Sequence, residues 1–178
     1  MLYEGYNMIT LTVSELSAID TPTRIIWFLF ALPYPLLLLF FGWGVLYSVA
    51  GNHRLRIAGS LIIAYSILNF YWPPMHQREV IAAGGSTLTD TLHIIWAMMT
   101  IVFNMLLMWV GAAALGKRFR FYTITTWVIF IVFGTLTFME SPRLEANLPT
   151  PHIGLWERIN MGAFLVWIVV FAINLLRN

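Results

Sequence analysis

The chain consists mainly of long apolar stretches that alternate with short polar connections. Glycines, prolines and charged residues separate five such stretches. A helix that crosses the hydrocarbon core of a membrane needs about 20 apolar residues, because the core is about 30 Å thick and the helix rises about 1.5 Å per residue. The pattern therefore predicts five transmembrane helices. They cover about residues 24–49, 57–74, 91–115, 121–139 and 155–176.

Prolines and glycines mark where the predicted helices bend or end. Pro33 and Pro35 fall inside the first span and should kink it, because proline has no backbone N–H and its ring crowds the preceding turn. The Pro73-Pro74 pair should end the second span near residue 74. In the connection that follows, over residues 75–90, Gly84-Gly85-Ser86 predicts a flexible turn.

Residues 1–22 are more polar than the rest and form a leader on the outer face. Within the leader, Thr12-Val13-Ser14-Glu15 has the spacing of a capping box, in which the Thr hydroxyl and the Glu carboxylate accept hydrogen bonds from free N–H groups. The pattern predicts a short interfacial helix over about 13–19 that lies at the membrane surface. An ordinary polar leader is an equally good interpretation.

Composition supports a chain whose main solvent is lipid. The 178 residues are 60% hydrophobic and only 10% charged, whereas a soluble domain is about 25% charged. Lipid offers no partner to free backbone groups, so the expected spans are helices. We therefore predict an all-α, polytopic transmembrane helix bundle that forms one integral-membrane domain, residues 1–178, with no nucleic-acid partner. The absence of cysteine excludes disulfides and thiol catalysis.

Alternation of the five spans assigns every charged residue to one side of the membrane. Six basic residues fall together on one side, without any acid: Arg54, Arg56, Lys117, Arg118, Arg120 and Arg177. The other four fall opposite: Arg24, Arg78, Arg143 and Arg158. The positive-inside rule then places the first group and the C-terminus in the cytoplasm of an inner-membrane protein. All eight acids, together with His76, His93 and His152, face outward.

The best candidate for chemistry is an outward-facing cluster between the second and third spans. His76 ends the second span and His93 lies in the first turn of the third, so a short loop joins them. Asp90 and His93 are three residues apart and share one helical face, and Glu79 follows His76 by three residues. Ionisable groups near membrane depth are costly and tend to be functional. The candidate catalytic residues are therefore His76, Glu79, Asp90 and His93.

Two chemistries suit this cluster. His76, His93 and Asp90 could ligate zinc or a similar divalent ion that activates water. Alternatively, a carboxylate could orient a histidine as general base, with Ser14 or Ser86 as the nucleophile. Neither chemistry has a specific sequence signature. The plainer interpretation is that Asp90 caps a helix, the histidines are solvated, and nearby arginines pair with acids at the water boundary.

Four segments carry a resemblance to a known family. They are Thr12-Val13-Ser14-Glu15-Leu16-Ser17-Ala18 with Pro22 and Arg24; Pro74-Met75-His76; Thr89 to His93; and Gly154-Leu155-Trp156-Glu157-Arg158-Ile159. Together they resemble the bacterial and archaeal integral-membrane family catalogued as domain of unknown function 998. Members of that family usually have six or more spans, with a helix before the Thr-Val-Ser-Glu-Leu segment. The resemblance implies that this usual first helix is lacking here, and it implies no particular activity.

Three functions remain open. The leading hypothesis is a non-enzymatic accessory or structural membrane component, or a binder of lipids or small molecules. The second is a metal- or histidine-dependent hydrolase of lipid or envelope substrates at the outer leaflet. The third is a transporter, which the prolines of the first span favour and the lack of an acid or base at mid-depth opposes. The expected partners are the lipid bilayer and either further copies of the chain or a partner membrane subunit.

Overall fold

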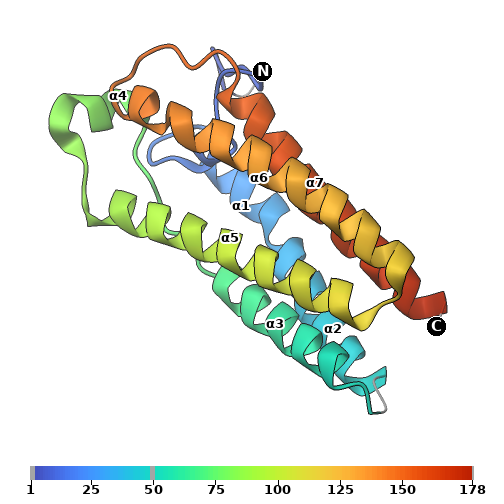
Figure 1. The fold of residues 1–178 in the computed structure, drawn as a ribbon. Coiled ribbons are helices and arrows are strands. Elements are labelled where there is room, and N and C mark those ends of the chain that lie inside the picture. The colour runs from blue at the N-terminus through green and yellow to red at the C-terminus, as the bar shows by residue number, and fades with distance from the viewer. Residues whose placement is uncertain (1–2, 49–50, 178) are drawn as a thin grey trace. The chain divides into compact units, whose positions relative to one another are not determined.

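The computed structural model describes residues 3–48 and 51–177, and these form helices joined by loops, without a β-strand (Figure 1). The predicted all-α fold is confirmed. In chain order the elements are the 3-10 helix η1 (Ser14–Ser17), α1 (Arg24–Ala31), α2 (Pro33–Ser48), α3 (His53–Asn69), the short α4 (Arg78–Val80), the π-helical turn η2 (Ile81–Gly85), α5 (Leu88–Ala114), α6 (Lys117–Glu145) and α7 (Ile153–Arg177).

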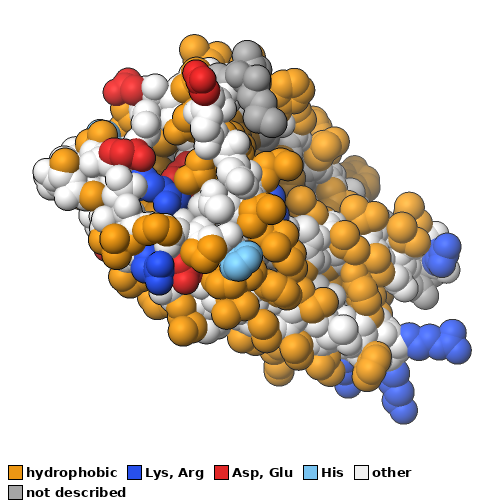
Figure 2. Space-filling model, turned by 90° about the horizontal axis from the view of Figure 1, so that it is seen from above, with side chains coloured by type: hydrophobic (Ala, Val, Ile, Leu, Met, Phe, Trp, Pro, Cys, Tyr) orange, Lys and Arg blue, Asp and Glu red, His pale blue; other side chains and the backbone are white. Residues whose placement is uncertain are grey.

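Within residues 3–48 and 51–177, four helical stretches are long and apolar enough to cross a membrane. They are Arg24–Ser48, which comprises α1 and α2, and the whole of α5, α6 and α7. At 17 residues, α3 is shorter than the roughly 20 residues that a straight crossing needs. Hydrophobic side chains cover much of the helix surface that is visible in Figure 2. Such a surface is typical of a membrane protein, and the four stretches are roughly consistent with the predicted five spans.

The first crossing stretch is interrupted where its prolines predict a kink. α1 ends at Ala31, and α2 begins at Pro33. Proline is well tolerated in the first turn of a helix, because the backbone N–H that it lacks would have no partner there. A new helix therefore starts at the proline instead of the old one continuing. The predicted end of this span, residue 49, lies outside the described residues.

Glycines and one hydrogen bond join α2 closely to α3. A methyl group added at Gly42 would lie 3.0 Å from the carbonyl oxygen of Gly59, and one added at Gly59 would lie 3.1 Å from that of Gly42. Ser66 Oγ donates a 2.7 Å hydrogen bond to the carbonyl oxygen of Pro35. Small residues and interhelical hydrogen bonds stabilise helix pairs in lipid, where burial of apolar surface supplies little driving force.

The helix at the predicted second span, 57–74, covers different residues, His53–Asn69. α3 begins four residues earlier because the side chain of Asn52 caps it by accepting two backbone N–H bonds. The helix ends at Asn69, and the chain is not helical again until Arg78. A residue that precedes proline avoids the helical conformation, so the Pro73-Pro74 pair disfavours helix at Trp72 and Pro73 within this connection.

The other three spans also differ from their predicted bounds, mostly because the helices are longer. α5 begins at 88 rather than 91, α6 covers 117–145 rather than 121–139, and α7 covers 153–177 rather than 155–176. Hydrophobic residues mark the lipid-facing part of a helix, whereas backbone hydrogen bonding continues into polar turns at its ends. α6 even includes Pro142 in its last turn, where proline removes only one helical hydrogen bond.

The fold divides into two compact units. Unit 1 comprises Met1–Phe30, Trp72–Trp96 and Ile129–Gly162, and unit 2 comprises Ala31–Tyr71, Ala97–Val128 and Ala163–Asn178. All eight Asp and Glu residues belong to unit 1, whereas unit 2 holds six of the ten Lys and Arg residues and no acid. The units therefore separate the charges in the same way as the alternation of spans does.

Candidate functional site

The polar residues of unit 1 surround an N-terminal segment, residues 3–23, in which η1 is the one described helix. The predicted capping box is confirmed. Glu15 Oε2 accepts a 2.7 Å hydrogen bond from the Thr12 N–H, and the Glu15 N–H donates to Thr12 Oγ1 at 3.2 Å. Instead of the longer helix predicted over 13–19, a single 3-10 turn follows, and its residues Glu15 and Ser17 are buried within unit 1.

A buried ion pair joins η1 to the start of α4. Arg78 Nε lies 2.6 Å from Glu15 Oε1, and Arg78 Nη2 lies 2.9 Å from Glu15 Oε2. Only 8% and 6% of the two side chains are exposed. Arg78 Nη1 also donates to Thr150 Oγ1 at 3.0 Å, and that hydroxyl donates to the carbonyl oxygen of Thr10 at 2.9 Å. The pair thus joins three separate stretches of chain, and both charges have close partners.

The first turns of α7 also bind the N-terminal segment. Arg158 Nη1 donates to two of its carbonyl groups, including that of Leu11 at 3.1 Å. The Val13 N–H donates a 2.5 Å hydrogen bond to Glu157 Oε2. A Cβ added at Gly154 would overlap the carbonyl oxygen of Leu11. Close approach of the segment to α7 therefore requires glycine at this position.

Tyr6 adds a further link between the segment and α7. Its hydroxyl accepts a hydrogen bond from Arg158 Nη2 and donates one to the carbonyl oxygen of Thr12 at 2.9 Å. Burial raises the pKa of Tyr6 above its ordinary value, and the charge of Arg158 opposes that rise without cancelling it. The phenol therefore keeps its proton at neutral pH, and both hydrogen bonds persist.

Asp90 organises the start of α5. Its Oδ2 accepts the Thr87 N–H at 2.8 Å, and its Oδ1 accepts the His76 N–H at 2.7 Å. The His76 ring contributes a second contact, because its Nδ1 lies 2.9 Å from Asp90 Oδ2. The sequence predicts that Asp90 caps the helix from the position before it. Because α5 starts at residue 88, Asp90 lies instead in the first turn of the helix. The carboxylate holds the loop around His76 against this turn.

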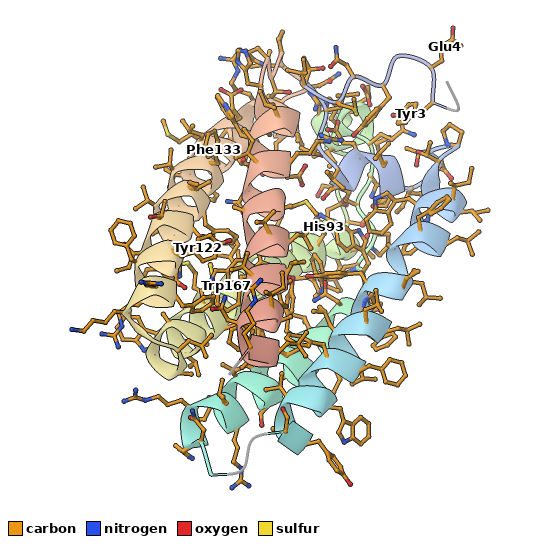
Figure 3. The ribbon with its side chains drawn as sticks, turned by 90° about the vertical axis from the view of Figure 1, so that its right-hand side faces the viewer. Tyr3, Glu4, His93, Tyr122, Phe133 and Trp167 are labelled. Carbon is orange, nitrogen blue, oxygen red and sulfur yellow. The ribbon has the colours of Figure 1, made fainter. Side chains whose placement is uncertain are left out.

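His93 reaches from α5 to η1. Its Nε2 lies 3.1 Å from Ser14 Oγ, and its Nδ1 lies 2.8 Å from the carbonyl oxygen of Pro73. A carbonyl oxygen only accepts, so Nδ1 carries the proton, and in the neutral ring Nε2 accepts from the Ser14 hydroxyl. His93 is only 8% exposed and lies among packed side chains (Figure 3). Ser14 and His93 are thus arranged as a nucleophile and a base, with a backbone carbonyl orienting the ring.

An aromatic cluster adjoins His93. The Trp72 ring lies edge-on to the imidazole, with 5.5 Å between ring centroids. Trp72 also contacts Trp96 at 4.4 Å and Trp27 at 4.5 Å between centroids. Trp72 Nε1 is buried and has no hydrogen-bond partner among the described residues. The ring cluster that contains His93 therefore holds one unused donor for a polar ligand.

The structure brings the predicted cluster together only in part. His76 contacts Asp90, whereas His93 contacts Ser14, and Glu79 is exposed. Within residues 3–48 and 51–177, no group of three or more His, Asp or Glu side chains is placed to hold a metal ion. Of the three candidate ligands for zinc or a similar divalent ion, His76 and Asp90 contact each other, whereas His93 contacts Ser14 and the Pro73 carbonyl oxygen.

Glu15 and Arg78 are buried and paired within unit 1, yet neither belongs to the predicted site. The sequence identifies Glu15 only as a helix cap, and it predicts that Arg78 pairs with an acid at the water boundary without indicating which one. The two are 63 positions apart, so no local spacing pattern could pair them. The one available signal is that Arg78 is one of four basic residues on the side that holds every acid.

Comparison with protein families finds a match over nearly the whole chain. A family model described as "Protein of unknown function (DUF998)" matches residues 1–174. The chain belongs to the DUF998 family. The resemblance of its motifs is therefore confirmed. No curated protein and no solved structure matches the chain.

In this member of the DUF998 family, the segments that carry the resemblance contact one another in unit 1. Residues 12–18 form the capping box and η1, and residues 89–93 include the Asp90 and His93 contacts. Residues 154–159 supply the α7 contacts to the N-terminal segment. Hydrogen bonds between these segments join Val13 to Glu157, Ser14 to His93 and His76 to Asp90.

Proposed function

We propose that the chain is a multi-pass protein of the inner membrane, with the polar part of unit 1 outside and the C-terminus in the cytoplasm. The separation of charges supports this orientation. Unit 2 contains six basic residues and no acid, and basic residues near the ends of spans remain on the cytoplasmic side. The eight acids of unit 1 then face outward with the N-terminal segment.

In this proposal the chain is a non-enzymatic membrane component, and the polar part of unit 1 is its binding surface, a platform that does not move. Its ligand is a lipid headgroup, a small molecule or a partner subunit at the outer leaflet. The observation that carries the proposal is the Glu15–Arg78 pair, which holds the N-terminal segment across three stretches of chain. Separating a buried pair costs about 3–5 kcal/mol. A segment held this firmly suits a static surface better than the moving gate of a transporter.

Single-cysteine labelling tests both the orientation and the rigidity, because the natural chain has no cysteine to interfere. We expect a membrane-impermeant maleimide to label the Glu79→Cys variant in intact cells and the Arg118→Cys variant only after permeabilisation. Both positions are exposed, so accessibility reports the side of the membrane. Ser17 is 0% exposed, and cysteine is close to serine in size, so the Ser17→Cys variant should react only after denaturation.

Two results would contradict this proposal. Labelling of the Arg118→Cys variant in intact cells would reverse the orientation. Labelling of the folded Ser17→Cys variant as fast as the Glu79→Cys variant would show that the N-terminal segment opens. That second result would favour the transporter over the fixed platform.

The contact between Ser14 and His93 supports a second candidate function, hydrolysis of lipid or envelope esters at the outer leaflet. Ser14 Oγ would attack the ester carbonyl carbon while His93 Nε2, 3.1 Å away, takes the hydroxyl proton. The protonated ring would return that proton to the departing alcohol, and water would then cleave the acyl group from Ser14. The Pro73 carbonyl oxygen accepts a hydrogen bond from Nδ1–H of His93, and this keeps Nε2 unprotonated and able to act as the base.

A fluorophosphonate probe, which reacts with activated serines, distinguishes the hydrolase from the platform. If the chain is a hydrolase, the probe labels the purified protein at Ser14, and the Ser14→Ala variant is not labelled. The His93→Gln variant should react about 10²–10⁴-fold more slowly, the usual contribution of a general base. The Ser86→Ala variant is the control, because Ser86 is exposed and its loss should change nothing. A folded wild-type protein that the probe leaves unlabelled would exclude the hydrolase.

A further inference from the structure

Unit 2 carries six basic residues and no acid. All six of its Lys and Arg residues are exposed. The ion pairs found in the described residues, by contrast, all lie within unit 1. Arg54 is engaged, because its Nη1 donates a 2.6 Å hydrogen bond to the carbonyl oxygen of Ala113 near the end of α5. A positive region without acids attracts anions.

A shallow, open groove of about 530 Å³ lies on one face of α3 in this unit. It is lined by His53, Arg56, Ile57, Ser60, Leu61 and Ala64. These positions recur every three or four residues and therefore follow one face of the helix over about 16 Å. The polar end holds the histidine and the arginine, and the rest of the groove is mainly apolar.

We propose that this groove binds an anionic phospholipid, with the phosphate at Arg56 and His53 and one acyl chain along Ile57, Leu61 and Ala64. A cationic end joined to an apolar face is complementary to an amphiphile with an anionic head. Basic pockets beside transmembrane helices take lipid phosphates in this way. The site is separate from the platform of unit 1, and the inference does not depend on it.

A second copy of the chain is a poorer occupant of the groove. Two copies in one membrane share the same orientation, so a two-fold contact along α3 would bring equal depths of the helix together. Arg56 would then lie beside Arg56 of the second copy, and like charges repel. An anionic headgroup removes this repulsion, which is the reason to favour lipid over self-association.

Native mass spectrometry of the full chain in a non-ionic detergent tests the proposal. The probes are phosphatidylglycerol and phosphatidylcholine with matched acyl chains. We expect one tightly retained phosphatidylglycerol and no comparable phosphatidylcholine. The Arg56→Gln variant should bind phosphatidylglycerol about fivefold more weakly, the contribution expected of one basic residue at an anionic headgroup. The Ala64→Phe variant, which fills the apolar end, should lose the retained lipid.

The Arg177→Gln variant is the matched control, because Arg177 is an exposed basic residue of unit 2 that does not line the groove. Its affinity for phosphatidylglycerol should be unchanged. An equal loss in both arginine variants would overturn the proposal, because attraction would then depend on total charge alone. Equal retention of phosphatidylcholine would also overturn it. Displacement of the lipid by glycerol phosphate at similar concentration would show an anion site without an acyl-chain site. Dimers instead of bound lipid would place a second copy in the groove.

Discussion

Replacing Arg78 with methionine is expected to destabilise unit 1 by about 3–5 kcal/mol, because the buried Glu15 carboxylate loses its counter-ion. Methionine has a similar length but neither charge nor donors. The carboxylate would retain its hydrogen bonds from the Thr12 N–H and hydroxyl, at 2.7 and 2.9 Å. These cannot replace the two guanidinium contacts, at 2.6 and 2.9 Å. Thermal unfolding of the purified protein in detergent, followed by tryptophan fluorescence, measures the loss.

Two controls make this result specific to the buried pair. In the Glu15→Leu/Arg78→Met double variant neither charge of the pair remains, so most of the lost stability should return. Arg143 forms an ion pair with Glu140 at 3.5 Å, but its side chain is 49% exposed. The Arg143→Met variant should therefore change stability by less than about 1 kcal/mol. Equal unfolding temperatures for the Arg78→Met and Arg143→Met variants would contradict the assigned role of the buried pair.

Replacing Gly154 with alanine is expected to detach the N-terminal segment from α7, at a cost of about 1–3 kcal/mol. The added methyl group would overlap the carbonyl oxygen of Leu11, and a backbone group cannot rotate away as a side chain can. The hydrogen bond from the Gly154 N–H to the carbonyl oxygen of Ile9, now 2.9 Å, would lengthen or break. Limited proteolysis should then cut within residues 3–23 of the folded variant and spare the wild type.

Gly162 provides the matched control on the same helix. A Cβ at this position meets no atom within 4 Å, so the Gly162→Ala variant has no steric cost. Alanine favours a helix over glycine by about 1 kcal/mol, and the variant should be as stable as the wild type or slightly more so. If the Gly154→Ala variant protects residues 3–23 as well as the Gly162→Ala variant does, the segment does not depend on close contact with α7.

Features that depend on solvent or on near neighbours could be predicted from the sequence. The apolar runs indicate lipid as solvent without reference to the fold, because partitioning depends on composition. The break before Pro33 depends on the covalent geometry of proline, and the capping box on two residues three positions apart. The alternation of spans also divides the charged residues into the same two groups as the two units do. This division could be predicted because it depends only on the order of the spans along the chain.

Only part of the membership of the candidate site could be predicted. The pairing of His76 with Asp90 spans 14 positions and brings together two of the predicted residues. His93, however, contacts Ser14, which is 79 positions away. A histidine beside several polar groups can bind any of them, and spacing along the chain does not rank such partners. The sequence therefore could not show whether His76 and His93 would bind the same metal ion.

The sequence by itself determined that this is a helical membrane protein, where its first span bends, and which residues cap the turn at Glu15. The tertiary structure alone decided that Glu15 pairs with Arg78 and that Ser14 meets His93. The physical reason is the range of the interactions. Helix formation, capping and transfer into lipid are governed by neighbours within a few residues and by composition. The two distant pairs exist only because separate stretches of chain are folded into unit 1, where burial makes each contact strong.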